Sequence, residues 1–62
     1  MNKVAIKKIN EMIKSPRFVK IVSVTDKHVV IQNKVGYQQI DNFGRVYNVF
    51  SLDELKEIND EK

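Results

Sequence analysis

His28 and Asp26 are the residues whose types and spacing come nearest to a catalytic or metal-binding pair. They are two positions apart, so both side chains would share a face if one strand contained them. A histidine beside a carboxylate can transfer protons or ligate zinc. Two ligands are too few for a protein zinc site, and no other histidine and no cysteine is present. The pattern therefore favours a solvent-facing histidine at the shoulder of a hairpin.

The serines and glycines lack the spacing that catalytic motifs require. Ser15, Ser23 and Ser51 have no flanking glycines of the kind found at a nucleophile elbow. Gly36 and Gly44 are isolated, so they do not form a phosphate-binding loop. Without cysteine, disulfides, thiolate catalysis and cysteine-ligated zinc are excluded. We therefore expect no enzyme activity, no catalytic residues, no metal site and no cofactor.

Basic and aromatic residues form the group with the clearest potential for recognition. Cations contact phosphates and tyrosine rings stack on bases, so their combination on strands is typical of a nucleic-acid surface. A phenylalanine at a turn tip would instead anchor a protein partner. The candidate partner-binding residues are Arg17, Lys20, Lys34, Tyr37, Phe43, Arg45 and Tyr47. Lysines also protect strand edges and tyrosines are common in strands, so these residues leave both classes of partner open.

The length and the charge distribution restrict what the chain can do. Its 62 residues fit one domain, 1–62, which is too small for a deep catalytic cleft. Residues 1–50 carry nine Lys or Arg and three Asp or Glu, whereas residues 51–62 carry two Lys and five Asp or Glu. A basic body with an acidic tail indicates an anionic or mixed-charge partner, or a tail that offsets the charge of the body.

Helices are predicted at both ends of the sequence. The first covers residues 2–14 and ends at Ser15-Pro16, because proline disfavours a helical residue before it and lacks an N–H. Its apolar residues recur at spacings of three and four: Ala5, Ile6, Ile9, Met12 and Ile13. The second covers residues 52–59 and follows a capping box of Ser51 and Glu54, with a hydrophobic staple between Phe50 and Leu55.

Four strands are predicted between these helices, over residues 17–24, 28–32, 37–41 and 45–50. Nine valines and seven isoleucines against two leucines favour a sheet. The short turns between the strands make neighbouring strands antiparallel. The predicted fold class is therefore a small α+β domain, a four-stranded antiparallel β-meander flanked by an N-terminal and a C-terminal helix.

The placement of the two helices decides how much apolar surface remains open. Helices on opposite faces of the sheet would close the monomer. Helices on one face would leave apolar strand residues for a second copy or a partner, namely Phe18, Val22, Val24 or Val30. We expect a non-enzymatic small binding protein whose partner is another protein, with a homodimer as a further alternative. Nucleic acid, bound by a basic and Tyr-containing sheet face, is the main alternative.

In size and composition alone, the chain resembles small α/β accessory proteins of phages and mobile elements. It is rich in Lys, Ile and Asn and contains no Cys. Many such proteins, including anti-CRISPR and antitoxin-like proteins, inhibit or modulate a host protein by stoichiometric binding, and the resemblance implies the same here. No motif ties the chain to a named family. We further expect a cytoplasmic location without membrane association, since no secretory h-region or long apolar run is present.

Overall fold

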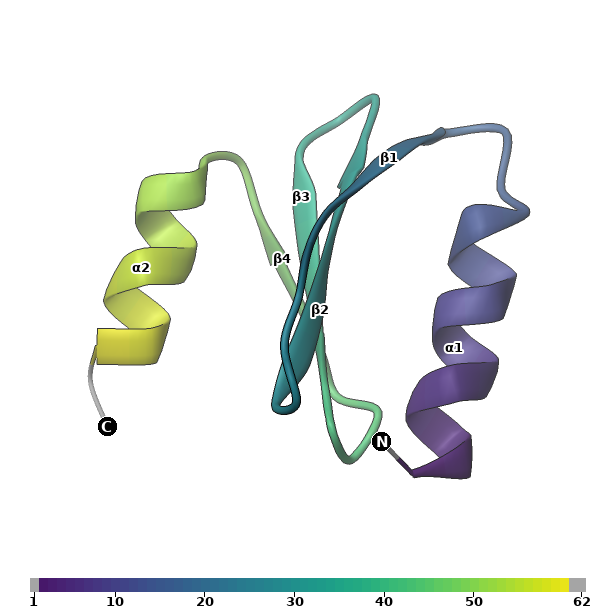
Figure 1. Cartoon of the computed structure of the whole chain (residues 1–62). Helices are drawn as coiled ribbons and strands as arrows, with labels where there is room; N and C mark the ends of the chain where they lie inside the picture. The colour runs from purple at the N-terminus through teal and green to yellow at the C-terminus, as the bar shows by residue number, and fades with distance from the viewer. Residues whose placement is uncertain (1, 61–62) are drawn as a thin grey trace.

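The computed structural model describes residues 2–60 as two helices and a four-stranded antiparallel sheet (Figure 1). The elements are α1 (Lys3–Ile13), β1 (Phe18–Val24), β2 (His28–Asn33), β3 (Tyr37–Asp41), β4 (Val46–Val49) and α2 (Leu52–Asp60). Each bound lies within one residue of the predicted one. The predicted fold class, an α+β domain with a helix at each end, is confirmed.

The sheet is a meander in which chain order and spatial order agree, β1-β2-β3-β4. In the central strands, Val29 of β2 pairs with Ile40 of β3, and Ile31 pairs with Gln38. Ile31 also pairs with Ile21 of β1. Because paired residues point to the same face, these rows define one face of the sheet, and the alternate residues define the other.

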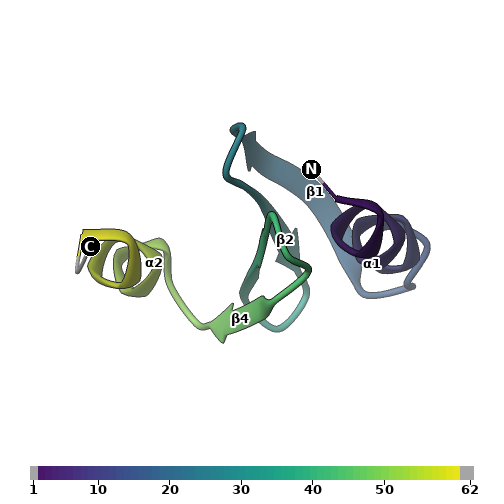
Figure 2. The same cartoon turned by 90° about the horizontal axis from the view of Figure 1, so that it is seen from below.

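The two helices pack on opposite faces of the sheet, so the structure has three layers (Figures 1 and 2). The core under α1 consists of Ala5, Val29, Ile31 and Ile40, with Ile9, Met12, Phe18 and Val46 packed around it. The core under α2 consists of Val30, Val49 and Leu55, with Val22, Tyr37 and Ile58 packed around it. Of the two arrangements that the sequence allowed, the one with a helix on each face is therefore adopted.

The apolar face of α1 is narrower than the sequence pattern predicts. Ala5 is buried and Ile9 and Met12 are half-buried, whereas Ile6 and Ile13 are exposed. A straight helix against a sheet buries only the stripe that faces it, and the flanking residues stay at the surface. The helix begins after Asn2, whose Oδ1 accepts a hydrogen bond from the backbone N–H of Ala5 at 3.0 Å.

The start of α2 confirms the predicted cap but not the predicted staple. The N–H of Glu54 donates to Ser51 Oγ at 3.4 Å, and Glu54 Oε2 accepts from the N–H of Phe50 at 3.2 Å. Phe50 is 79% exposed, while Leu55 packs beside Val49 in the core. Val49, one residue before Phe50, occupies the position that the staple would have used, so the aromatic ring is directed outward.

Ser51→Ala is expected to lower the free energy of unfolding by about 1 kcal/mol, because it removes the side-chain acceptor of the α2 cap. Urea denaturation followed by circular dichroism measures this loss. Ser23→Ala is the control, since Ser23 is an exposed serine on β1 outside any helix. Equal losses in the two variants would mean that the hydroxyl of Ser51 does not stabilise the helix.

Candidate functional site

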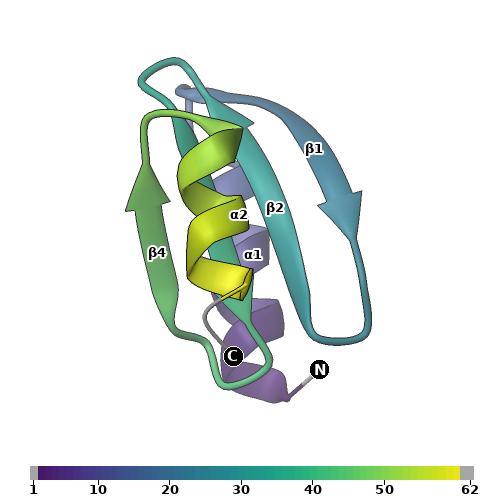
Figure 3. The same ribbon diagram turned by 90° about the vertical axis from the view of Figure 1, so that its left-hand side faces the viewer.

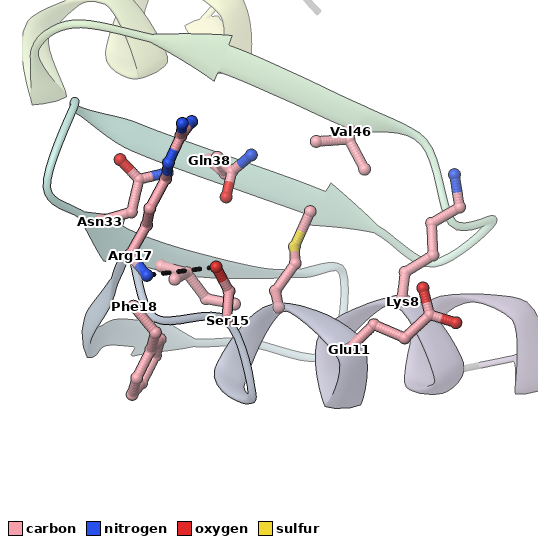
Figure 4. A pocket seen from close by; sticks show the side chains of 10 residues that line it. Lys8, Glu11, Ser15, Arg17, Phe18, Asn33, Gln38 and Val46 are labelled. Carbon is pink, nitrogen blue, oxygen red and sulfur yellow. Dashed lines mark hydrogen bonds between the residues drawn. The ribbon is translucent and has the colours of Figure 1, made fainter.

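A cleft of about 440 Å³ lies between α1 and the sheet (Figure 4). Its floor is apolar and is formed by Met12 of α1, Phe18, Ile31 and Val46. Polar side chains border this floor: Lys8, Glu11, Ser15, Arg17, Asn33 and Gln38. An apolar floor with a few polar groups at its border is typical of ligand and peptide sites.

The cleft is open because the apolar core under α1 gives way to amides near the turn between β2 and β3. Asn33, Gln38 and Asn48 replace aliphatic residues on the sheet face that carries Ile31 and Ile40. Gln38 Nε2 donates a hydrogen bond to Asn48 Oδ1 at 2.8 Å. Amides that bond to each other and are also solvated gain no free energy from burial under the helix. This part of the sheet face therefore stays uncovered.

Arg17 is held at the border of the cleft by its backbone. Its N–H donates to Ser15 Oγ at 3.2 Å, and its carbonyl accepts from the N–H of Lys34 at 2.9 Å. The side chain extends beside Asn33 and Gln38 (Figure 4). Within residues 2–60 the guanidinium makes no hydrogen bond and no ion pair. A guanidinium without a partner in residues 2–60, on a backbone held in place by hydrogen bonds, can bind a carboxylate with two parallel hydrogen bonds.

A second hollow of about 300 Å³ adjoins the cleft and shares Arg17, Asn33 and Gln38 with it. It extends past Gly36 to Val35 and Phe50, which are 62% and 79% exposed. Arg17 therefore lies where the two hollows meet, and an aromatic side chain stands at the far end. Arginine and aromatic residues are the types enriched in the energetically dominant part of protein interfaces.

Gly36 allows the turn between β2 and β3 to approach the end of β4. A Cβ atom at this position would lie 2.5 Å from the carbonyl oxygen of Val49. The turn is also closed by Asn33, whose Oδ1 accepts hydrogen bonds from the N–H groups of Val35 and Gly36, both at 2.8 Å. This close approach places Val35 beside Phe50 in the second hollow.

The structure gathers only part of the candidate set that the sequence suggested. Arg17 and Tyr37 line the second hollow, and Lys34 is bonded to the backbone of Arg17. Lys20 lies in the row that contains Gln32 and Tyr37, on the sheet face that α2 covers. These four residues belong to the end of the sheet near the turn between β2 and β3.

The turn between β3 and β4 lies at the other end of the sheet (Figure 1), and this turn and the start of β4 contain the remaining candidates, Phe43, Arg45 and Tyr47. Phe43 and Arg45 belong to the turn between β3 and β4, where both of their N–H groups donate to Asp41 Oδ1 at 2.9 Å. Phe43 is 73% exposed. Tyr47 lines a third hollow, of about 220 Å³, beside Ile58 of α2. The seven candidates therefore do not form one surface.

The basic, Tyr-containing sheet face is the face on which α2 packs. Tyr37 packs against the core under α2, and Gln39 is buried and hydrogen-bonded to Asn59. Figure 3 shows α2 in front of the sheet, between β4 and β2, with β1 farther to the side. Within residues 2–60, no four-stranded open face is therefore presented to a nucleic acid.

His28 is half-buried at the start of β2 and pairs across the sheet with Asp41 rather than lying beside Asp26. Its N–H donates to Thr25 Oγ1 at 3.1 Å, a contact that closes the turn between β1 and β2. Residues 2–60 contain no group of three or more His, Cys, Asp or Glu side chains that could hold a metal ion. The backbone of His28 therefore contributes to the geometry of the hairpin.

The two outer layers of the protein carry opposite charge. α1 has three lysines and one glutamate, and Lys14 follows it directly. α2 has one lysine and four carboxylates: Asp53, Glu54, Glu57 and Asp60. Since the helices lie on opposite faces, the side of α1 attracts anionic groups and the side of α2 attracts cationic groups.

The sequence analysis missed most of the residues that form the cleft and the second hollow. Phe50 was assigned to a staple, and Met12 to the helix core. Val35 could have been recognised, because the turn itself does not require an apolar residue among Asn, Lys and Gly, and such a residue indicates a contact surface. Asn33 and Gln38 could not have been recognised from the sequence, since they line the cleft only because α1 covers their face of the sheet.

No helix among residues 2–60 has the length and apolar content that a membrane crossing requires. Comparison with protein-family models, with curated proteins and with solved structures finds no match for this chain.

Proposed function

We propose that this chain is a small non-enzymatic binding protein that inhibits or modulates a partner protein by stoichiometric binding, in the manner of phage and mobile-element accessory factors. The observation that carries the proposal is the position of Arg17. Its uncommitted guanidinium lies where two hollows meet, and the exposed Phe50 stands at the far end of one of them. This combination has the composition of an interface centre.

The cleft favours a partner segment that combines an apolar side chain with a carboxylate. The apolar side chain would lie on Met12, Ile31 and Val46. The carboxylate would accept hydrogen bonds from Arg17, with Lys8 contributing positive charge at the α1 border. Among residues 2–60, Glu11 is the one carboxylate that lines the cleft, and it disfavours a segment with many negative charges next to α1.

A protein partner is favoured over nucleic acid because α2 packs on the sheet face that carries both tyrosines. Tyr37 packs against the core under α2, and the half-buried Tyr47 lines a hollow together with Ile58, so the two rings do not form an open platform for stacking successive bases. Nucleic acid remains the alternative, supported by the lysines of α1 together with Arg17 and Lys34. Its binding would be dominated by phosphates and would depend steeply on salt.

Arg17→Glu and Phe50→Ser are each expected to weaken binding of the partner at least about tenfold, which corresponds to about 1.4 kcal/mol. The first reverses the charge that meets the carboxylate, and the second removes the exposed anchor. The partner is captured from cells with the tagged full-length chain, then purified, and the affinity of each variant is measured by titration calorimetry. A stoichiometry of one chain per binding site is expected.

Phe43→Ser is the matched control for Phe50→Ser, because both rings are exposed to a similar extent at opposite ends of the sheet. Its affinity should equal that of the unmodified chain. If Phe43→Ser weakened binding and Phe50→Ser did not, the site would lie at the turn between β3 and β4 and the assignment of the cleft would be wrong.

The nucleic-acid alternative is tested by fluorescence anisotropy with labelled single-stranded DNA, duplex DNA and RNA at about 50 and about 200 mM salt. We expect no binding at micromolar protein. Binding that weakens steeply with salt and is lost in Arg17→Glu would replace the protein partner by a nucleic acid.

A further inference from the structure

α1 has a second apolar flank that the sheet does not cover. Ile6 and Ile13 are seven residues apart and therefore lie on the same side of the helix, and both are exposed. On the opposite flank, Lys8 and Glu11 line the cleft together with residues of β3 and β4. The flank of Ile6 and Ile13 must therefore face the side of β1.

β1 continues this apolar surface. Ile21 and Val24 pair with Ile31 and Val29, so their side chains point to the sheet face on which α1 packs. Both are exposed, Val24 to 67%. Figure 2 shows that β1 begins beside the end of α1 and diverges from the helix along its length, which agrees with the exposure of these two residues. We call Ile6, Ile13, Ile21 and Val24 the α1–β1 apolar surface.

Lysines border this surface along the helix. Lys3, Lys7 and Lys14 follow one another at spacings of four and seven, so they form a row on the outer side of α1, next to Ile6 and Ile13. At the far end, Asp26 lies in the turn after Val24 and is followed by Lys27. Exposed β-branched residues beside a row of cations fit an occupant that is apolar in the middle and acidic at its border.

A second copy of the chain does not have this chemistry. Its own α1–β1 apolar surface would bring a second row of lysines against the first. Its α2 carries carboxylates on the outer side, but Leu55 and Ile58 are turned toward the sheet. The exposed apolar residues at the start of α2 are Leu52, at its first position, and Phe50, which precedes the helix. Because the apolar side of α2 is already packed on the sheet, residues 2–60 offer no acidic helix with a free apolar side. The bound helix therefore belongs to a different protein.

The edge of β1 also favours a helix over an added strand. The pairing of β1 with β2 shifts register between Phe18 and Lys20 and again between Ile21 and Ser23. Such irregularities in an edge strand disturb the row of backbone groups that an added strand would use. Side-chain packing, as in recognition of an amphipathic helix, does not need that row.

We propose that the α1–β1 apolar surface binds an acidic amphipathic helix of a partner protein. The inference rests on the proposed function in that the occupant is a polypeptide, but it uses the flank of α1 opposite to Arg17. The apolar side of the bound helix lies on the four β-branched residues, and its Asp and Glu side chains face Lys3, Lys7 and Lys14.

The test uses a synthetic helical peptide of about 20 residues, a length at which isolated helices form. Leucines at helical spacing form its apolar side, and glutamates flank them. The full chain, with labelled Ile and Val methyl groups, is titrated with this peptide and followed by NMR. Methyl shifts concentrated at the α1–β1 apolar surface are expected. Val24→Ser should weaken binding about tenfold.

Val35→Ser is the matched control, because Val35 is a valine of similar exposure in the turn between β2 and β3. The methyl shifts at the α1–β1 apolar surface should be the same in this variant as in the unmodified chain, and also in Arg17→Glu, because both positions lie outside that surface. The proposal is overturned by equal losses in Val24→Ser and Val35→Ser, by equal binding of a peptide with lysines in place of the glutamates, or by no methyl shifts. It is also overturned if the same methyl groups shift on concentrating the chain alone, which would show a second copy as the occupant.

Discussion

Ile40→Ala is expected to remove most of the stability of the protein at room temperature. Ile40 is completely buried on the central strand β3, where it packs with Ala5, Val29 and Ile31 under α1. Truncating a buried isoleucine to alanine costs about 2–5 kcal/mol, because apolar burial is lost and a cavity remains. A domain of this size has a total stability of only about 3–5 kcal/mol. The single substitution therefore removes most of that stability.

Urea and thermal denaturation followed by circular dichroism measure this effect. Ile21→Ala is the matched control, since Ile21 lies on the same sheet face but is exposed on the edge strand. Its loss should stay below about 0.5 kcal/mol. Ile40→Val, expected to cost about 0.5–1.5 kcal/mol, gives a folded variant for quantitative comparison. Similar losses for Ile21→Ala and Ile40→Ala would mean that the core does not lie under α1.

Asn59→Ala is expected to destabilise the packing of α2 by about 1–3 kcal/mol. Gln39 is buried in β3, and its side chain is paired with Asn59 in both directions. Gln39 Nε2 donates to Asn59 Oδ1 at 3.1 Å, and Asn59 Nδ2 donates to Gln39 Oε1 at 3.0 Å. Removing Asn59 leaves a buried amide without either partner, which costs more than the hydrogen bonds contribute when both are present.

Two comparisons isolate this effect. Asn48→Ala removes one partner of the amide pair formed with Gln38, but Asn48 is exposed, so water replaces it and the loss should be small. The double variant Gln39→Leu, Asn59→Leu replaces both partners by apolar groups and should be close to neutral. Native-state hydrogen exchange of the α2 amides reports the loosening. The single variants Gln39→Leu and Asn59→Leu are measured as well. If the free energy of unfolding lost in the double variant equalled the sum of the losses in these two, the two amides would not be coupled.

The elements of this fold could be predicted because their signals are local. α1 ends at Ser15-Pro16, where the N–H of Ser15 donates to the carbonyl of Met12, and α2 starts with Ser51 and Glu54, through contacts that span three or four residues. The short turns determine that each strand pairs with its neighbour, which produces the meander. None of these features depends on distant parts of the chain, so sequence spacing was sufficient to predict them.

The interpretation of Gln39 and Phe50 failed because each depends on distant residues. Gln39 alternates with Tyr37 and so belongs to the basic, Tyr-containing face that the sequence predicts to be open, but Asn59, twenty residues later, satisfies its amide and allows it to be buried. Phe50 satisfied the spacing of a staple, but Val49 filled the position beside Leu55. The pattern of polar and apolar residues along one strand or helix does not reveal which residue of another element contacts it in the folded structure.

By itself the sequence determined the fold class, the order of the elements and the cap of α2, because short-range hydrogen bonds and turn conformations encode them. The tertiary structure alone decided that the helices lie on opposite faces, that α1 buries Ala5 and Ile9 but leaves Ile6 exposed, and that Arg17 meets two hollows. The physical reason is that α1 presents more apolar residues than one sheet face can cover. The divergence of β1 from the helix then selects which of them remain at the surface.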